Sequence, residues 1–312
     1  MTGSQVTIFG GSGFLGRYVV DRFARAGHPI RVAVRRPHAA LFLKPLGDVG
    51  QIDILRTDVR NDASVAAAVA RSGIVVNLVG ILAERGRQRF DAIHAEAAGR
   101  IAAAARHAGT ERLVHVSAIG ADPHSDSAYG LSKAEGERRI RESFPEATIL
   151  RPSVVFGPED DFTNRFARLL RLLPVMPLVC GDSLFQPVYV GDVADAVLAA
   201  AKRVDAAGRI YELGGPQQIA FRDLLMTIMH EIGVQRPLLP VPLSLVRLGA
   251  ALLGLLPNPP ITSDQLRLLM KDNVVGEGAA TLADLGIAPT PMASVLSDYL
   301  MVWRRGGQFA AA

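Results

Sequence analysis

Short apolar segments alternate with amphipathic ones over the first two-thirds of the chain. The apolar segments predict β-strands; they are Val6–Phe9, Ile30–Val34, Gln51–Leu55, Ile74–Leu78, Leu113–Val116 and Thr148–Arg151. The amphipathic segments predict helices, including Ala63–Ala70, Phe90–His107 and Phe162–Leu173. Strands that alternate with helices favour an α/β fold with a parallel sheet. The almost wholly apolar Ile74–Leu78 is typical of a central parallel strand.

The second half of the chain continues this alternation and then becomes helical from Phe221. Val188–Val190 is predicted to return to the sheet, Asp192–Ala201 to pack on it as a helix, and Arg209–Leu213 to form a last strand. We therefore expect an interleaved organisation. Its parts are a larger domain of residues 1–157 with 186–214, a smaller, mostly helical domain of 158–185 with 215–300, and a frayed tail of 301–312.

A glycine-rich turn joins the first strand to an amphipathic helix. Gly10, Gly13 and Gly16 are spaced G-x-x-G-x-x-G, and Gly11 with the last two also gives G-x-G-x-x-G. Such glycines allow a tight turn, a close approach of backbone to a pyrophosphate, and close packing of helix on strand, while the helix N-terminus attracts phosphates. The larger domain is thus predicted to bind a dinucleotide. The candidate residues here are Gly10, Ser12, Gly13, Phe14, Leu15 and Gly16; the alternative is a turn without a ligand.

The residues after the second predicted strand bear on the choice of cofactor. An NAD site has an acidic residue near this position for the ribose hydroxyls, but no Asp or Glu occurs between Asp21 and Asp48. Arg35 and Arg36 stand there instead, and a guanidinium suits a 2′-phosphate. The sequence favours NADPH, or NADP in general, over NAD; the alternative is a solvated basic turn.

Further candidates follow the third and fourth strands. The side chain of Asp58 is expected to accept a hydrogen bond from the adenine amino group, with Val59 against the adenine ring. The alternative is that Asp58 is a plain turn residue. Asp62 is expected to cap the helix that follows. Val79 and Gly80 come directly after the fourth strand, where a glycine lets backbone lie against a cofactor.

Ser117, Tyr129 and Lys133 form a second constellation. Tyr129 and Lys133 are four residues apart at the start of a predicted helix, so both side chains share one face. Lys133 would lower the pKa of the phenol and hold a nicotinamide ribose. Tyr129 would exchange a proton with a carbonyl oxygen, to which Ser117 would donate a hydrogen bond. The alternative is a surface tyrosine near a helix N-terminus.

These residues, in this order, resemble the extended short-chain dehydrogenase/reductases. The resemblance implies a doubly wound, seven-stranded parallel sheet with a small C-terminal substrate domain. It also implies that Tyr129 is the catalytic acid/base, Lys133 its helper and Ser117 the hydroxyl that orients the substrate.

The second half narrows the resemblance. Its segments Glu159–Phe162, Gln186–Val190 and Ala283–Ile287 are similar to those of the nucleotide-binding accessory subunit of respiratory complex I and its bacterial relatives. That resemblance runs nearly end to end. It implies a bound NADPH of structural role and association with hydrophilic-arm subunits near the membrane. The alternative is a free-standing reductase or epimerase for a hydrophobic or isoprenoid-like substrate, which the Ser117, Tyr129 and Lys133 set favours.

Composition excludes several other classes. Hydrophobic residues are 49% and charged residues 21% of the chain, which argues for a large core and against disorder. A net charge of +4 without a cluster of basic and aromatic residues argues against nucleic acid. The single cysteine, Cys180, forms no internal disulfide and suits a reducing compartment, and the seven histidines show no metal-ligand spacing.

A mean hydropathy of +0.23 points to a buried partner surface or a membrane-facing patch. Leu238–Leu256 is the most apolar segment, and prolines bracket it. Its predicted helix is too short to span a bilayer, so it packs either in the small domain or at a membrane or a membrane-bound partner. With no room for a signal peptide before the first strand, we expect a cytoplasmic protein that is peripheral on the cytoplasmic face of the inner membrane.

Overall fold

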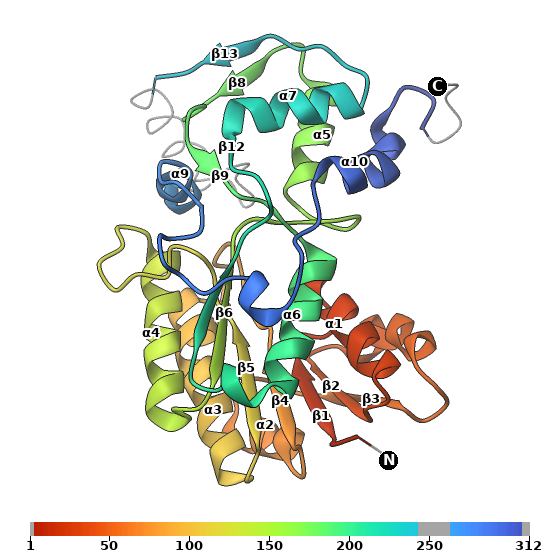
Figure 1. Cartoon of the computed structure of the whole chain (residues 1–312), viewed down its shortest axis with the longest axis vertical. Helices are drawn as coiled ribbons and strands as arrows, with labels where there is room; N and C mark the ends of the chain where they lie inside the picture. The colour runs from red at the N-terminus through yellow and green to blue at the C-terminus, as the bar shows by residue number, and fades with distance from the viewer. Residues whose placement is uncertain (1–2, 243–262, 308–312) are drawn as a thin grey trace. The chain divides into compact units, whose positions relative to one another are not determined.

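The computed structural model describes residues 3–242 and 263–307 (Figure 1). Two compact units make up the chain. Unit 1 comprises residues 1–152, 190–213 and 276–288, and unit 2 comprises 153–189, 214–275 and 289–312. Unit 1 contains the glycine-rich turn and the Ser117, Tyr129 and Lys133 set.

A seven-stranded parallel sheet forms the centre of unit 1. Its order is β11-β6-β5-β4-β1-β2-β3, which confirms the α/β class with a doubly wound parallel sheet. The strands are β1 (Val6–Phe9), β2 (Ile30–Val34), β3 (Ile52–Arg56), β4 (Ile74–Asn77), β5 (Arg112–Val116), β6 (Thr148–Pro152) and β11 (Ile210–Leu213). The order reverses beside β1, because β2 and β3 lie on one side of it and β4, β5 and β6 on the other.

Helices cover both faces of this sheet (Figure 1). One layer holds α2 (Asp62–Val69), the π-turn η2 (Asp91–Glu96), α3 (Ala97–His107) and α4 (Ala128–Ser143). The other holds α1 (Phe14–Arg25) and α6 (Val190–Lys202). The short helical segments η1 (Pro37–Leu46), η3 (Val204–Ala206) and η4 (Ala283–Leu285) complete the unit.

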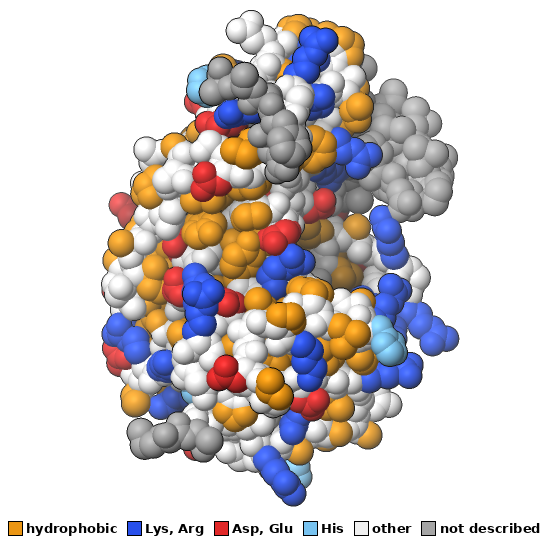
Figure 2. Space-filling view, turned by 90° about the vertical axis from the view of Figure 1, so that its right-hand side faces the viewer, with side chains coloured by type: hydrophobic (Ala, Val, Ile, Leu, Met, Phe, Trp, Pro, Cys, Tyr) orange, Lys and Arg blue, Asp and Glu red, His pale blue; other side chains and the backbone are white. Residues whose placement is uncertain are grey.

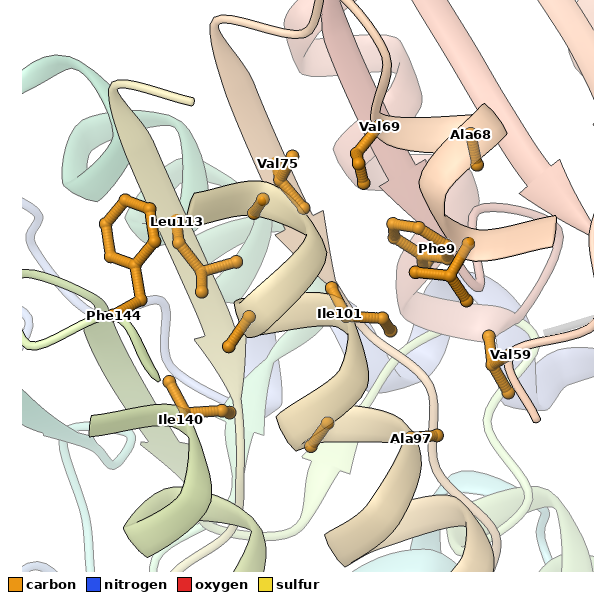
Figure 3. Close-up of a cluster of buried hydrophobic side chains, with 14 of the residues drawn as sticks. Phe9, Val59, Ala68, Val69, Val75, Ala97, Ile101, Leu113, Ile140 and Phe144 are labelled. Atoms are coloured by element: carbon orange, nitrogen blue, oxygen red, sulfur yellow. The ribbon is translucent and has the colours of Figure 1, made fainter. Parts of the chain in front are cut away.

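The core of the first layer is drawn in Figure 3. Phe9, Val75 and Leu113 project from the strands into one cluster with Ile101 of α3 and Ile140 of α4. Each of these side chains is at most 3% exposed. The buried face of α3 is otherwise alanine, namely Ala97, Ala98, Ala102 and Ala105. These small side chains let α3 lie close to the sheet between its neighbours.

Unit 2 consists of small sheets and helices around a second core. Its elements are β7 (Val155–Phe156), α5 (Thr163–Leu172), β8 (Met176–Leu178), β9 (Leu184–Phe185), β10 (Val188–Tyr189), β12 (Ile219–Ala220), α7 (Phe221–Glu231), β13 (Leu238–Pro240), α9 (Ser263–Leu269), α10 (Ala293–Leu300) and η5 (Met301–Trp303). Leucines and phenylalanines form this core, in which the ring of Phe221 contacts the rings of both Phe166 and Phe185. Of Leu238–Leu256, the first residues form β13, paired with β8, and residues 243–256 lie outside the described residues.

Three local predictions are wrong. Val188–Tyr189 does not return to the large sheet, because it pairs with β7 in a separate two-stranded sheet. Asn61, not Asp62, caps α2, since its side chain accepts from the backbone N–H of Ser64 at 2.8 Å.

The third concerns the tail, which is not frayed over Met301–Gly307. Trp303 Nε1 donates to Asn164 Oδ1 at 2.8 Å, and Arg304 Nε donates to the carbonyl of Glu231 at 2.7 Å. The indole also packs against the core of unit 2. Side-chain anchors that no local pattern signals therefore hold this segment in place.

Within the part of the chain that the structure describes, no helix combines the length and hydropathy needed to cross a bilayer.

Candidate nucleotide site

The candidate residues of unit 1 lie at the carboxyl edge of its parallel sheet. Gly10 follows β1, Arg35 follows β2, Asp58 lies two residues beyond β3, Val79 two beyond β4, and Ser117 follows β5. The strand order reverses between β1 and β4, and in open α/β sheets ligands bind at this edge near such a reversal. The fold thus gathers residues that are far apart in the sequence.

The glycines of the turn are required by its geometry. Gly10 has a φ of +80°, which favours glycine. A Cβ atom on Gly16 would lie 2.3 Å from the carbonyl oxygen of Gly10, so α1 packs directly on the turn. The N–H of Gly13 donates to that same carbonyl at 3.0 Å. The turn matches the cradle that a pyrophosphate needs.

The N-terminus of α1 opens at this turn. Gly13 is its N-cap residue, and no side chain among the described residues caps it there. Ser12, Phe14 and Leu15 are partly buried around it. The first-turn N–H groups of a helix have no acceptor within that helix, and the helix dipole favours an anion beside them.

Arg35 and Arg36 follow β2 and are both exposed. On the face drawn in Figure 2, Lys and Arg side chains gather with a His along one edge, and acidic side chains lie elsewhere on it. Exposed guanidinium groups at this edge of the sheet are chemically suited to contact a phosphate group.

The carboxylate of Asp58 is engaged by Arg60. Arg60 Nε donates to Oδ1 at 2.9 Å, and a terminal nitrogen of Arg60 donates to Oδ2 at 2.7 Å. Hydrogen bonds from Arg60 lower the pKa of Asp58 to about 2. Val59 is 7% exposed and packs in the core drawn in Figure 3. Asp58 therefore lies at the carboxyl edge of the sheet, and both of its carboxylate oxygens accept hydrogen bonds from Arg60. The side chain of Val59 faces the core.

The segment after β4 is fixed by Asn77. The N–H of Val79 donates a hydrogen bond to Asn77 Oδ1 at 3.1 Å, which fixes the orientation of the Asn77 amide. The amide nitrogen, Nδ2, then donates to Nδ1 of His115 at 3.1 Å. The proton of the His115 ring then sits on Nε2, which is buried and without a hydrogen-bond partner among the described residues. Burial, followed by the charge of Lys133, holds the pKa of His115 well below 6.5.

Lys133 lies near the ring of Tyr129 and bonds to Val116, the residue before Ser117. Ser117 is 4% exposed, and its Oγ has no hydrogen-bond partner among the described residues. Ser127 caps α4 just before Tyr129. Lys133 Nζ lies 5.9 Å from the centroid of the Tyr129 ring and donates to the carbonyl of Val116 at 3.3 Å.

The expectation that Lys133 lowers the pKa of the phenol is wrong. Burial raises the pKa of Tyr129 to about 12, whereas burial, opposed by Glu137, lowers the pKa of Lys133 to about 8. Both pKa values move towards the neutral form, because burial penalises the charged form of each group.

Sequence reasoning missed His94 and His115, both 1% exposed beside Lys133. His94 lies in η2 and contacts the rings of Phe90 and Tyr129. His94 lies within a predicted amphipathic helix and His115 within a predicted strand, and neither has a neighbouring residue pattern that marks it as functional.

The model of the NAD dependent epimerase/dehydratase family matches residues 6–214. The chain is 36% identical over 297 residues to the mitochondrial NADH dehydrogenase [ubiquinone] 1 alpha subcomplex subunit 9 of Mus musculus, covering 94% of this chain and 78% of that protein. It is 29% identical over 239 residues to the ceramide reductase of Caulobacter vibrioides, covering 76% of this chain and 73% of that protein. The UDP-glucose 4-epimerase of Thermotoga maritima shares the fold, with a TM-score of 0.71 at 16% identity. The match covers 95% of this chain and 97% of that one.

Proposed function

The chain belongs to the NAD dependent epimerase/dehydratase family and to the group within it that includes the complex I alpha subcomplex subunit 9, and from this premise we propose that it is an NADP(H)-binding accessory or assembly component of NADH:quinone oxidoreductase. One observation carries the proposal. The similarity to the mouse subunit covers 94% of the chain, whereas the family model ends at residue 214. The similarity to the mouse subunit therefore extends past residue 214 into the rest of unit 2, beyond the part of the chain that the family model matches.

The residues at the sheet edge fit a nicotinamide dinucleotide. The turn from Gly10 to Gly16 and the N-terminus of α1 would hold the pyrophosphate, because the geometry at Gly10 and Gly16 requires glycine and the helix dipole is favourable. Arg35 and Arg36 would hold the 2′-phosphate of NADPH, and Lys133 the nicotinamide ribose. When bound, such a nucleotide supplies two-electron redox chemistry or, without turnover, binding free energy.

A structural role for the nucleotide agrees with the state of Tyr129. A proton-transfer group works best with a pKa near the working pH, and that of Tyr129 is about 12. A ligand that binds only the folded state stabilises it by mass action, by about 2.7 kcal/mol at a hundredfold excess over Kd. The nucleotide would thus stiffen unit 1 for assembly with hydrophilic-arm subunits near the membrane.

Comigration tests the main proposal. Membranes of the source cells are solubilised in mild detergent and resolved by size exclusion, and fractions are assayed for this chain and for NADH:quinone oxidoreductase activity. We expect the two to coelute, and expect deletion of the gene to lower the amount of assembled complex. Elution of the chain alone, with an unchanged complex in the deletion strain, would refute the proposal.

Membrane contact through Leu238–Leu256 is a separate part of the proposal. Its support is the apolar sequence with bracketing prolines, since residues 243–256 lie outside the described residues. The double variant Leu252→Glu/Leu255→Glu should move the protein from the membrane to the soluble fraction with unchanged melting temperature. A large loss of thermal stability would instead place these leucines in a core.

A second candidate is a free-standing NADP-dependent reductase or epimerase for a hydrophobic carbonyl or alcohol. The buried Ser117 Oγ, without a partner among the described residues, favours it, because a substrate oxygen would satisfy that hydroxyl. The ceramide reductase relative acts, by its name, on a lipid. Loss of NADPH absorbance with a panel of long-chain and isoprenoid-like carbonyl compounds tests this candidate. Absence of turnover across the panel argues against it.

A further inference from the structure

His94 connects two segments of the candidate site that are distant in sequence. Its Nε2 accepts a hydrogen bond from the backbone N–H of Ile81 at 3.0 Å. Its Nδ1 lies 2.9 Å from Oγ of Ser132 in α4. Because Nε2 accepts, the proton of the neutral ring is on Nδ1, which donates to Ser132.

Ser132 carries this connection on to Tyr129. The Ser132 hydroxyl donates to the backbone carbonyl of Tyr129 at 2.8 Å. The rings of His94 and Tyr129 also meet edge to face, with centroids 5.3 Å apart and planes at 86°. Phe90 stacks on His94 and touches the edge of Tyr129. The backbone and the ring of Tyr129 are therefore both held by contacts that begin at His94.

The other end of the connection is the segment predicted to lie against the nucleotide. Ile81 directly follows Gly80, and a Cβ atom on Gly80 would lie 3.7 Å from His94 Nε2 and 3.6 Å from Lys133 Nζ. A ligand placed against Gly80 would thus be adjacent to His94 and Lys133 at once.

The position of His94 is built into the packing. The π-turn η2 inserts an extra residue into the helical repeat before α3, as often occurs at functional sites. A Cβ atom on Gly136 would lie 2.1 Å from the carbonyl oxygen of His94, so α4 can approach η2 only with glycine there. Burial and then the Lys133 charge lower the pKa of His94 to about 3, so the ring stays neutral at physiological pH.

We propose that His94 is a positioning residue of the nucleotide site, which couples the Gly80–Ile81 segment to Tyr129 through Ser132. The proposal rests on the nucleotide binding proposed above. It predicts that nucleotide bound against Gly80 changes the environment of the Tyr129 phenol, and that the neutral imidazole transmits this change through its hydrogen bonds to Ile81 and Ser132.

The test uses the full chain labelled with 13Cζ-tyrosine, with the Tyr129 resonance assigned by comparison with Tyr129→Phe. NADPH affinity is measured by calorimetry, and the Tyr129 resonance is recorded with and without NADPH. In the wild type we expect NADPH to shift this resonance. His94→Leu should abolish the shift and weaken NADPH about tenfold, the scale of one lost hydrogen bond.

Matched variants separate the two arms of the connection. In His94→Gln the side-chain oxygen still accepts from Ile81, so affinity should return to within about threefold of the wild type, while the Tyr129 response stays lost. Ser132→Ala breaks only the second arm and should also lose the response. His28→Leu is the control, because His28 is likewise buried, in edge-to-face contact with Phe23, near the amino end of β2.

The outcomes distinguish this proposal from the function on which it rests. Wild-type protein that fails to bind NADPH refutes the proposed nucleotide function. NADPH binding with an unchanged Tyr129 response in both His94→Leu and Ser132→Ala overturns the role of His94 alone. If His94→Leu does not fold, Ser132→Ala decides the question by itself.

Discussion

Lys133 Nζ lies 5.9 Å from the centroid of the Tyr129 ring and directs a hydrogen bond to the backbone carbonyl of Val116, not to the phenol. Both side chains share one face of α4, but burial moves their pKa values towards the neutral forms, to about 12 for Tyr129 and about 8 for Lys133. Near neutral pH the Tyr129 phenol is therefore neutral, and the neighbouring Lys133 ammonium loses its proton more readily than an exposed lysine does.

The lowered pKa of Lys133 predicts a pH-dependent stability. The folded state releases this proton near pH 8 and the unfolded state near 10.5, so the unfolded state binds more protons between these values. The contribution of Lys133 to the unfolding free energy therefore rises with pH in this window, by up to about 3 kcal/mol. The wild type and Lys133→Met are unfolded in urea at pH 7, 8, 9 and 10. The unfolding free energy of the wild type should increase relative to that of the variant as the pH rises. A constant difference would contradict the assignment, and Lys202→Met, which removes an exposed lysine, is the control.

Removing the Ser117 hydroxyl should not destabilise the protein. Its Oγ is buried without a partner among the described residues, and the loss of such a group is neutral or stabilising by up to about 1 kcal/mol. If the protein is a reductase, Ser117→Ala and Tyr129→Phe should both lose turnover while NADPH still binds. Thermal melting, calorimetry and NADPH oxidation measure the three quantities. A clear loss of stability in Ser117→Ala would show that the hydroxyl already has a structural partner.

Two glycines of the site should respond differently to alanine. A Cβ on Gly16 would meet the Gly10 carbonyl at 2.3 Å, so Gly16→Ala should cost about 1–3 kcal/mol or more of stability and disrupt the turn. A Cβ on Gly80 meets only ordinary contacts, so Gly80→Ala should fold like the wild type. If backbone lies against the nucleotide there, this variant still weakens NADPH. Normal NADPH affinity in Gly80→Ala would remove Gly80 from the site.

The nucleotide preference should depend on Arg35. Replacing its guanidinium by a carboxylate in Arg35→Asp should weaken NADPH by about 1–3 kcal/mol, the scale of a charge-assisted hydrogen bond, and leave NADH nearly unchanged. Arg112→Asp makes the same charge change at the start of β5, far along the strand from this edge, and is the control. Calorimetric titration that gives equal affinities for NADPH and NADH in the wild type would refute the preference.

The sequence by itself determined the layout of unit 1. Its apolar runs predicted every strand of the large sheet to within a residue or two. The signal is strongest for a central strand such as β4, because a parallel strand buried on both faces is apolar on both. The glycine turn and the spacing of Tyr129 and Lys133 were equally local signals. Each depends on backbone geometry that a few neighbouring residues specify.

Only the tertiary structure decided the features that depend on distant residues. It placed Val188–Tyr189 against β7, anchored Trp303 on Asn164, and gave the Asp58 carboxylate to Arg60. It also buried His94 and His115 around Lys133, which no pattern in the sequence marks. The reason is physical: the cost of desolvating a charge, and the partner that satisfies a buried polar atom, depend on which segments pack together, and neighbours along the chain do not determine that packing.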